Sequence, residues 1–217
     1  AIALDLRQAG LSVHVATPYS YLGEDLCATL DLQSPKDDDY RRLMGTDATL
    51  CPAEIKSRLD KALIDADIDF LFKMRPVRPM RNAKGRICGA LFADRGGFHA
   101  IAAKVVVDAT WRATFAREAG VPMRPFAPGR RTMTMFAIGG APEGRPDVRV
   151  ERLPEPVVYK DRTFAAFKLA MDWNFDGTTM FDFAAANAAF RKAAWSPDGV
   201  AYPDLVRVDL DDGVDAD

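Results

Sequence analysis

Three consecutive valines followed by a helical pattern constrain this chain most. Val105–Val107 are β-branched and apolar on both faces, which predicts a fully buried strand. From Asp108 the period changes, because Phe115 and Ala119 lie four residues apart and Gly120 supplies a helix stop. A buried parallel strand that runs into a helix places the connecting residues at the carboxyl edge of a sheet. Doubly wound α/β folds bind their ligands at that edge.

Composition allows a globular α/β protein and excludes several other classes. The chain has 217 residues, of which 48% are hydrophobic, so it can bury a core. Its 29 basic and 31 acidic side chains give a net charge of −2, which offers no basic field for nucleic acid or an anionic membrane. No apolar run approaches the roughly 20 residues of a spanning helix, and no signal-peptide pattern is present.

Metal and disulfide chemistry have little support in the sequence. The three cysteines, Cys27, Cys51 and Cys88, are too few and too scattered for a disulfide framework or a zinc site. Only two histidines are available as further ligands. Cys27 lies in an apolar run, where a lone cysteine is usually a buried small hydrophobic residue. The sequence therefore predicts no metal.

The first 17 residues predict the second half of a βαβ unit. A helical pattern runs from Ile2 to Gly10, and Leu11–Thr17 follows as a β-branched strand. Nucleotide-binding versions carry G-x-G-x-x-G in the first half and an acid for the ribose at the end of the second strand. This sequence contains no such glycine turn, and Thr17 stands where the acid would be. Because the helix starts at Ala1 without a capping residue, we expect a fragment.

The next segments alternate in type. Gly23 permits close backbone approach or a positive φ, and Glu24 follows it. These residues predict either part of a ligand cleft or a loop and a helix whose first turn carries acids. A polar loop is expected next, with one helical turn at 40–44, and then an amphipathic helix at 52–66. A strand at 68–72 and an antiparallel meander with strands at 77–80, 86–93 and 97–102 complete this part.

In this order, the segments Tyr21-Leu22-Gly23-Glu24-Asp25 and Val106-Val107-Asp108-Ala109-Thr110 carry a resemblance. The chain resembles the FAD-dependent oxidoreductases with a glutathione-reductase-type Rossmann domain, over roughly residues 1–122. The resemblance implies that Gly23 and Glu24 line the dinucleotide cleft, with Thr17 at the ribose position. It also implies that Asp108, Ala109 and Thr110 contact the flavin or its ribityl-pyrophosphate portion.

Two observations bear on the last of these contacts. Trp111 follows Thr110, where the family often has glycine, and the residue type favours a core or interface anchor. Asp108 and Thr110 can alternatively form a helix cap or turn without touching a ligand.

The second half of the chain is less regular. Strands are predicted at 132–138, 148–150 and 157–159, a strand or a helix at 164–173, a helix at 182–194, and an acidic tail from Asp209. Five arginines form a candidate basic patch for a phosphate or carboxylate: Arg112, Arg117, Arg124, Arg130 and Arg131.

The predicted fold is α/β. Residues 1–122 form a partial Rossmann-like FAD-binding domain with an antiparallel meander at about 75–103, and residues 123–217 form part of an α+β substrate domain. The predicted function is a FAD-dependent oxidoreductase, or a fragment of one, acting on an unidentified small organic molecule. The alternative is a non-catalytic remnant or association domain that binds no FAD; a plain NAD module fits the meander less well. No catalytic side chain stands out, and homo-oligomerisation and localisation stay open.

Overall fold

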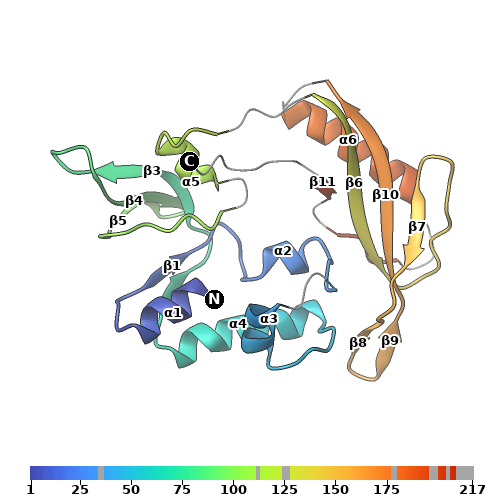
Figure 1. Cartoon of the computed structure of the whole chain (residues 1–217), viewed down its shortest axis with the longest axis horizontal. Helices are drawn as coiled ribbons and strands as arrows, with labels where there is room; N and C mark the ends of the chain where they lie inside the picture. The colour runs from blue at the N-terminus through green and yellow to red at the C-terminus, as the bar shows by residue number, and fades with distance from the viewer. Residues whose placement is uncertain are drawn as a thin grey trace. The chain divides into compact units, whose positions relative to one another are not determined.

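The computed structural model describes residues 1–33, 37–110, 113–123, 128–176, 180–195, 200–203 and 206–208. It is a mixed α/β structure with several separate sheets (Figure 1). The chain forms two compact units. One contains residues 23–62 and 126–212, and the other contains residues 2–22 and 63–125. The predicted domain boundary at 122/123 stays a prediction.

A helix and a parallel strand pair open the second unit. Helix α1 (Ile2–Gln8) ends at Gly10, whose φ of +81° lets its amide and that of Leu11 cap the helix carbonyls. Strand β1 (His14–Ala16) then pairs in parallel with β2 (Asp69–Leu71). The predicted sequence of helix, glycine and strand is confirmed.

The predicted meander is also confirmed. Strands β3 (Arg75–Arg81), β4 (Ile87–Asp94) and β5 (Gly97–Ala102) form an antiparallel sheet in the order β3-β4-β5. Asn82 accepts backbone hydrogen bonds in the turn between the first two strands, and Gly85 there has a φ of +76°. A short helix, α5 (Thr114–Glu118), follows the meander.

The strand predicted at Val105–Val107 is wrong. These residues have no strand conformation and pair with no described strand. Val105 is 76% exposed and Val107 is 52% exposed, so the segment is not buried. Among the described strands, β1 and β2 form a two-stranded sheet, and Val105–Val107 do not pair with either strand. A β-branched run favours an extended backbone, but burial needs strands beside it.

Three helices belong to the first unit or begin in it: α2 (Glu24–Cys27), α3 (Asp38–Met44) and α4 (Pro52–Asp65). The Asp37 carboxylate caps α3 by accepting from the amide of Tyr40 at 2.8 Å. Ile55 on α4 is fully buried. The predicted amphipathic helix is thus present within one residue of its expected end.

A four-stranded sheet with one covering helix is the core of the first unit. Its strands are β6 (Gly129–Ile138), β7 (Arg149–Arg152), β10 (Ala166–Phe175) and β11 (Arg207–Val208), in the order β11-β6-β10-β7. Helix α6 (Met180–Ala194) packs on one face of the sheet (Figure 1). Strands β8 (Val157–Tyr159) and β9 (Arg162–Phe164) form a separate hairpin.

Alternation along β6 and β10 explains why the sheet has one apolar face. Met133 and Met135 on β6 point to the same side as Leu169 and Met171 on β10, and all four are buried in one cluster with α6. The segment 164–173, which was predicted as a strand or a helix, is therefore mostly strand. Pairing with β6 and packing against α6 bury this segment, and the apolar pattern alone does not reveal these contacts.

The packing of α6 predicts a large effect of one substitution. Phe190 is completely buried between α6 and the sheet. Phe190→Ala should lower the free energy of unfolding by about 3–5 kcal/mol, because it leaves a cavity in the core. Urea unfolding followed by circular dichroism measures this loss. Phe181→Ala on the same helix is the control, since Phe181 is 85% exposed and its loss should cost little. Equal effects of the two substitutions would contradict this packing.

Candidate functional site

Thr17 lies directly after β1, at the carboxyl end of the parallel pair. Its amide donates to Leu71 O at 3.0 Å, and its carbonyl accepts from the amide of Met74 at 2.9 Å. The hydroxyl oxygen accepts from the amide of Tyr19 at 3.3 Å. That bond leaves the hydroxyl hydrogen free to be donated to one ligand oxygen. The arrangement fits a single hydrogen bond to a sugar hydroxyl.

The Asp108 carboxylate organises the loop that leads into α5. One oxygen accepts from the amide of Thr110 and the other from the amide of Ala116, both at 2.8 Å. The Thr110 hydroxyl in turn accepts from the amide of Thr114 at 2.7 Å. These bonds match the turn-forming role that the residue types allowed. Both carboxylate oxygens thus accept hydrogen bonds inside the loop, and the neighbouring residue Ala109 is exposed.

The sequence predicted that Asp108–Thr110 lie at the carboxyl edge of a sheet, and this prediction is wrong. They follow the exposed segment Val105–Val107, which is not a strand in the structure. The loop geometry therefore comes from the hydrogen bonds of Asp108 rather than from the end of a parallel strand.

Gly23 is required by packing. Its φ is +76°, and a Cβ there would lie 2.7 Å from Leu59 Cδ1 and 3.3 Å from Ile55 Cγ2. The residue thus lets α2 approach α4 closely. Glu24, the first residue of α2, is half-buried. Whether Gly23 and Glu24 line a cleft stays a prediction.

Cys27 is buried, as its apolar surroundings predicted. Cys27 and Cys51 are buried, and all three thiols are free. Burial raises the pKa of the Cys27 thiol to about 11, so it is not a thiolate near neutral pH. Within the described ranges no cluster of His, Cys, Asp and Glu could hold a metal ion.

Of the predicted arginine patch, Arg130 and Arg131 do not share a surface, and the patch as a whole stays a prediction. Arg130 and Arg131 are neighbours on β6, so their side chains lie on opposite faces of the sheet. Trp111, Arg112 and Arg124 lie outside the described residues. Arg117 is in α5, in the other compact unit.

Asp172 on β10 is the centre of a charged group that the sequence analysis missed. Its carboxylate accepts from Arg130 Nη2 at 2.8 Å, Arg149 Nη2 at 3.0 Å and Thr132 Oγ1 at 2.9 Å. Hydrogen bonds from Arg149, Thr132 and Arg130 hold the pKa of Asp172 well below its usual range. The carboxylate is therefore ionised near neutral pH and neutralises one of the two guanidinium groups.

The same face of the sheet has a further ion pair. Arg207 on β11 pairs with the buried Asp31, in the segment after α2. Thr134, opposite Arg207 in the register, is also buried. We call this side of the sheet, which carries Arg130, Thr132, Thr134, Arg149, Asp172 and Arg207, the polar sheet face. It lies opposite the side covered by α6.

Alternation could have revealed the polar sheet face. Arg130, Thr132 and Thr134 occupy every second position of β6 and so share one face. Asp172 and the polar Asn174 are likewise two residues apart on β10. The sequence does not give the register that places Asp172 opposite Thr132, so the group could not be assembled without the structure.

Comparison with known proteins identifies the family. Residues 15–204 match the family described as FAD dependent oxidoreductase. The chain belongs to this family. The narrower glutathione-reductase-type assignment is not confirmed. No curated protein sequence matches the chain.

Several solved structures have a similar fold. The crystal structure of AlpK is 14% identical with a TM-score of 0.57, and the match covers 97% of this chain and 50% of AlpK. BexE, studied for oxidation during BE-7585A biosynthesis, is 14% identical with a TM-score of 0.56 and the same coverage. CabE, an aromatic hydroxylase from angucycline biosynthesis, is 15% identical with a TM-score of 0.52, also over 97% and 50%. The chain spans about half the length of these proteins.

Thr17 can donate its hydroxyl hydrogen to one acceptor, and Ala109 is an exposed residue. Whether these residues contact a cofactor stays a prediction. The sequence contains no G-x-G-x-x-G turn, the pattern that binds a pyrophosphate in dinucleotide-binding folds. No helix of the described residues is long and apolar enough to cross a membrane.

The Asp108 hydrogen bonds give a graded prediction. Asp108→Ala should lower the free energy of unfolding by about 1–2 kcal/mol, because two backbone amides lose their acceptors. Asp108→Asn should lose less, since its amide group keeps one acceptor oxygen. Urea unfolding of the two variants measures the difference. Wild-type stability of Asp108→Ala would contradict the assigned role.

Asp172 predicts a pH-dependent stability difference. Asp172→Asn should unfold at a lower urea concentration than the wild type near neutral pH, because three donors lose an ionised acceptor. The folded pKa lies below the unfolded value of about 3.9, so the stabilisation is complete above that value and is lost as the pH falls below it. The difference between the two midpoints should therefore be constant down to about pH 5 and then shrink.

Asp176→Asn is the matched control for that titration. Asp176 is exposed directly after the same strand, and within the described residues it accepts a hydrogen bond from Asn174. Its substitution should change the midpoint little at any pH. If the midpoint difference between Asp172→Asn and the wild type stays constant below about pH 4, the pKa of Asp172 is not lowered in the folded protein.

Proposed function

We propose that the protein is a FAD-dependent oxidoreductase that acts on a small organic molecule. The observation that carries this proposal is the family match over residues 15–204, which includes both compact units. The finer fold supports it: the parallel pair β1-β2, the meander β3-β5 and the separate antiparallel sheet suit a FAD-binding portion and a substrate-binding portion. CabE supports an aromatic hydroxylation among the candidate reactions.

We assign the cofactor contacts to the residues predicted from the sequence: Thr17, Gly23, Glu24, Asp108, Ala109 and Thr110. Thr17 would donate its hydroxyl hydrogen to the ribose of FAD, because its oxygen is already held by the amide of Tyr19. Asp108 would hold the loop in shape and leave the backbone of Ala109 to contact the cofactor. Gly23 and Glu24 rest on the family resemblance alone.

We assign substrate binding to the polar sheet face. Arg130 and Arg149 share the single carboxylate of Asp172, so this group keeps a net positive charge. The guanidinium groups are largely exposed and have further N–H donors for a carboxylate or phenolate oxygen. Asp172 would hold both guanidinium groups in place.

The chemistry would be divided between flavin and protein. Bound flavin supplies the electron transfer. Asp172 is a poor proton acceptor near neutral pH, because its arginine partners keep its pKa low. Its role is to position Arg130 and Arg149, which would orient an oxygen of the substrate. Thr132 also holds the Asp172 carboxylate, because its hydroxyl donates to Oδ1.

Retention of FAD tests the proposal. The purified chain, mixed with FAD and passed through gel filtration, should elute with flavin absorbance. Thr17→Val should weaken FAD binding about fivefold, the effect of one neutral hydrogen bond. Thr163→Val on the exposed hairpin is the matched control and should bind as the wild type does. Thermal unfolding of each variant separates local damage from a lost ligand contact.

Two results would overturn parts of this account. Equal FAD affinity of Thr17→Val and the wild type would remove Thr17 from the site. Elution of the wild-type chain without flavin would favour the alternative, a non-catalytic domain. The exposed Val105–Val107 segment is the observation that supports that alternative.

A further inference from the structure

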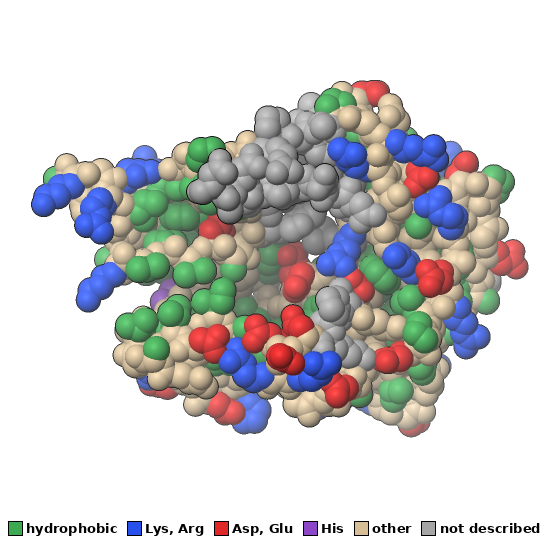
Figure 2. Space-filling view, in the orientation of Figure 1, with side chains coloured by type: hydrophobic (Ala, Val, Ile, Leu, Met, Phe, Trp, Pro, Cys, Tyr) green, Lys and Arg blue, Asp and Glu red, His purple; other side chains and the backbone are tan. Residues whose placement is uncertain are grey.

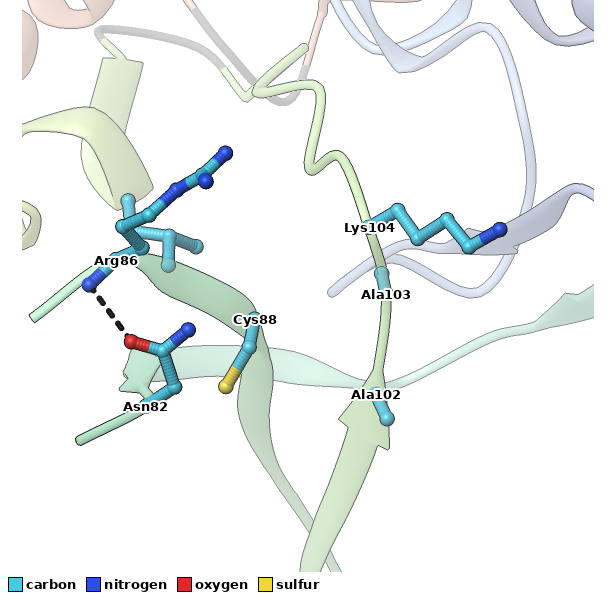
Figure 3. A pocket seen from close by; sticks show the side chains of 7 residues that line it. Asn82, Arg86, Cys88, Ala102, Ala103 and Lys104 are labelled. Atoms are coloured by element: carbon cyan, nitrogen blue, oxygen red, sulfur yellow. Dashed lines mark hydrogen bonds between the residues drawn. The ribbon is translucent and has the colours of Figure 1, made fainter. Parts of the chain in front are cut away.

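A hollow at one end of the meander plays no part in the site described above. Its volume is about 610 Å³, and it lies within the unit that contains β3, β4 and β5. The residues that line it include Asn82, Arg86, Cys88, Ala103 and Lys104. Figure 3 shows Asn82, Arg86 and Cys88 on one side and Ala102, Ala103 and Lys104 on the other. We call this space the meander hollow.

The turn between β3 and β4 fixes one wall of the meander hollow. Asn82 Oδ1 accepts from the amides of Lys84 at 2.9 Å and Arg86 at 3.1 Å. Because the side-chain oxygen is used in the turn, the Nδ2 group of Asn82 stays a hydrogen-bond donor. Arg81 ties the turn to the rest of the unit by donating to Gly85 O and Ala119 O, each at 2.8 Å.

A β-bulge places the Cys88 thiol in the wall. Met80 pairs with Gly89 and Arg81 pairs with Ile87, so Cys88 is an extra residue in β4. The carbonyl of Cys88 accepts from the amide of Ala103 at 3.0 Å. Gly89, at a φ of +151°, lets the two strands close here, since a Cβ would collide with the carbonyl oxygen of Ile101. Bulges commonly redirect a side chain in this way.

The ionisable side chains that line the hollow are two cations and a thiol. Arg86 and Lys104 both line it, and no Asp or Glu does. Within the described part of the chain, neither cation has a salt bridge among those identified. Figure 2 shows Lys and Arg side chains gathered at the end of the meander where β3 joins β4. A hollow whose polar side chains are hydrogen-bond donors is complementary to an anion.

The two cations have different positions. In Figure 3, Cys88 lies between Arg86 and Lys104, and the Lys104 side chain extends away from Arg86. Arg86 supplies a planar fork of donors, which matches two oxygens of one anion. Lys104 has a flexible four-carbon stem, so its ammonium group can turn toward a ligand held at the guanidinium group.

We propose that the meander hollow binds the oxyanion group of a small molecule, a phosphate or a carboxylate. Arg86 is the main anchor, Lys104 is the second cation, and the Nδ2 group of Asn82 donates a hydrogen bond. The Cys88 thiol lies beside the bound group and reports on it. This site is independent of flavin, so the proposal can fail while the proposed function stands.

Alkylation of Cys88 by two reagents of different charge tests the proposal. Iodoacetate is an anion and iodoacetamide is neutral, and each reacts when the thiolate displaces iodide. If the hollow attracts anions, Cys88 should react with iodoacetate faster, relative to iodoacetamide, than a free cysteine peptide does. Peptide mass spectrometry measures the two rates, and the buried Cys27 and Cys51 show whether the chain stays folded.

Charge-removing variants assign the effect to its residues. Arg86→Gln should lower the iodoacetate-to-iodoacetamide ratio about fivefold, the effect of one exposed unit charge at about 4 Å in water. Lys104→Gln should lower the ratio less. Lys84→Gln is the matched control, because Lys84 belongs to the same turn but does not line the hollow. A ratio that is unchanged in Arg86→Gln, or lowered equally in Lys84→Gln, would overturn the proposal.

Protection by added anions distinguishes the two ligand sources. Phosphate and acetate are compared with chloride at the same ionic strength, and the rate measured is that of iodoacetamide at Cys88. Protection by phosphate alone supports a phosphate ligand, protection by acetate alone supports a carboxylate, and protection by both supports either group. Protection by neither, or protection that persists in Arg86→Gln, would contradict an oxyanion site at Arg86.

Discussion

The parallel pairing of β1 with β2 is the constraint on which the proposed cofactor site depends. Parallel neighbours cannot be joined by a tight turn, so the chain between them must make a long crossover, and it does so through α2, α3 and α4. The pairing also brings the ends of both strands to one edge, where Thr17 exchanges backbone hydrogen bonds with Leu71 and Met74. The position of the Thr17 hydroxyl therefore follows from main-chain bonds.

The polar sheet face depends on a different pairing. Strands β6 and β10 are antiparallel over ten residue pairs, and this register places Thr132 opposite Asp172. Alternation then divides the sheet into an apolar side, which α6 covers, and a side that carries ion pairs. A shift of one residue would turn Asp172 into the core, where an ionised carboxylate is costly. Packing against α6 thus specifies the charged group on the other side.

Local patterns predicted much of the fold. Helix α4 and the strands of the meander follow from apolar spacing and turn residues, as does the glycine stop after α1. The failure at Val105–Val107 has a physical cause: a β-branched run reports a preference for extended backbone, while burial depends on neighbouring strands that the pattern does not reveal. Thr17 and Asp108 were candidates from the strand-end patterns and the family resemblance, but only the structure shows their hydrogen bonds. Asp172 was missed because its partners come from two other strands.

Amide hydrogen exchange with and without FAD tests the central claim, that the carboxyl end of the parallel pair binds the cofactor. The account predicts slower exchange on adding FAD in peptides that cover Thr17–Tyr19 and Ala109–Ala116. Peptides from the α6 side of the first unit should not change. Unchanged exchange at Thr17–Tyr19 in a sample that retains flavin would contradict the account, because FAD would then be bound elsewhere.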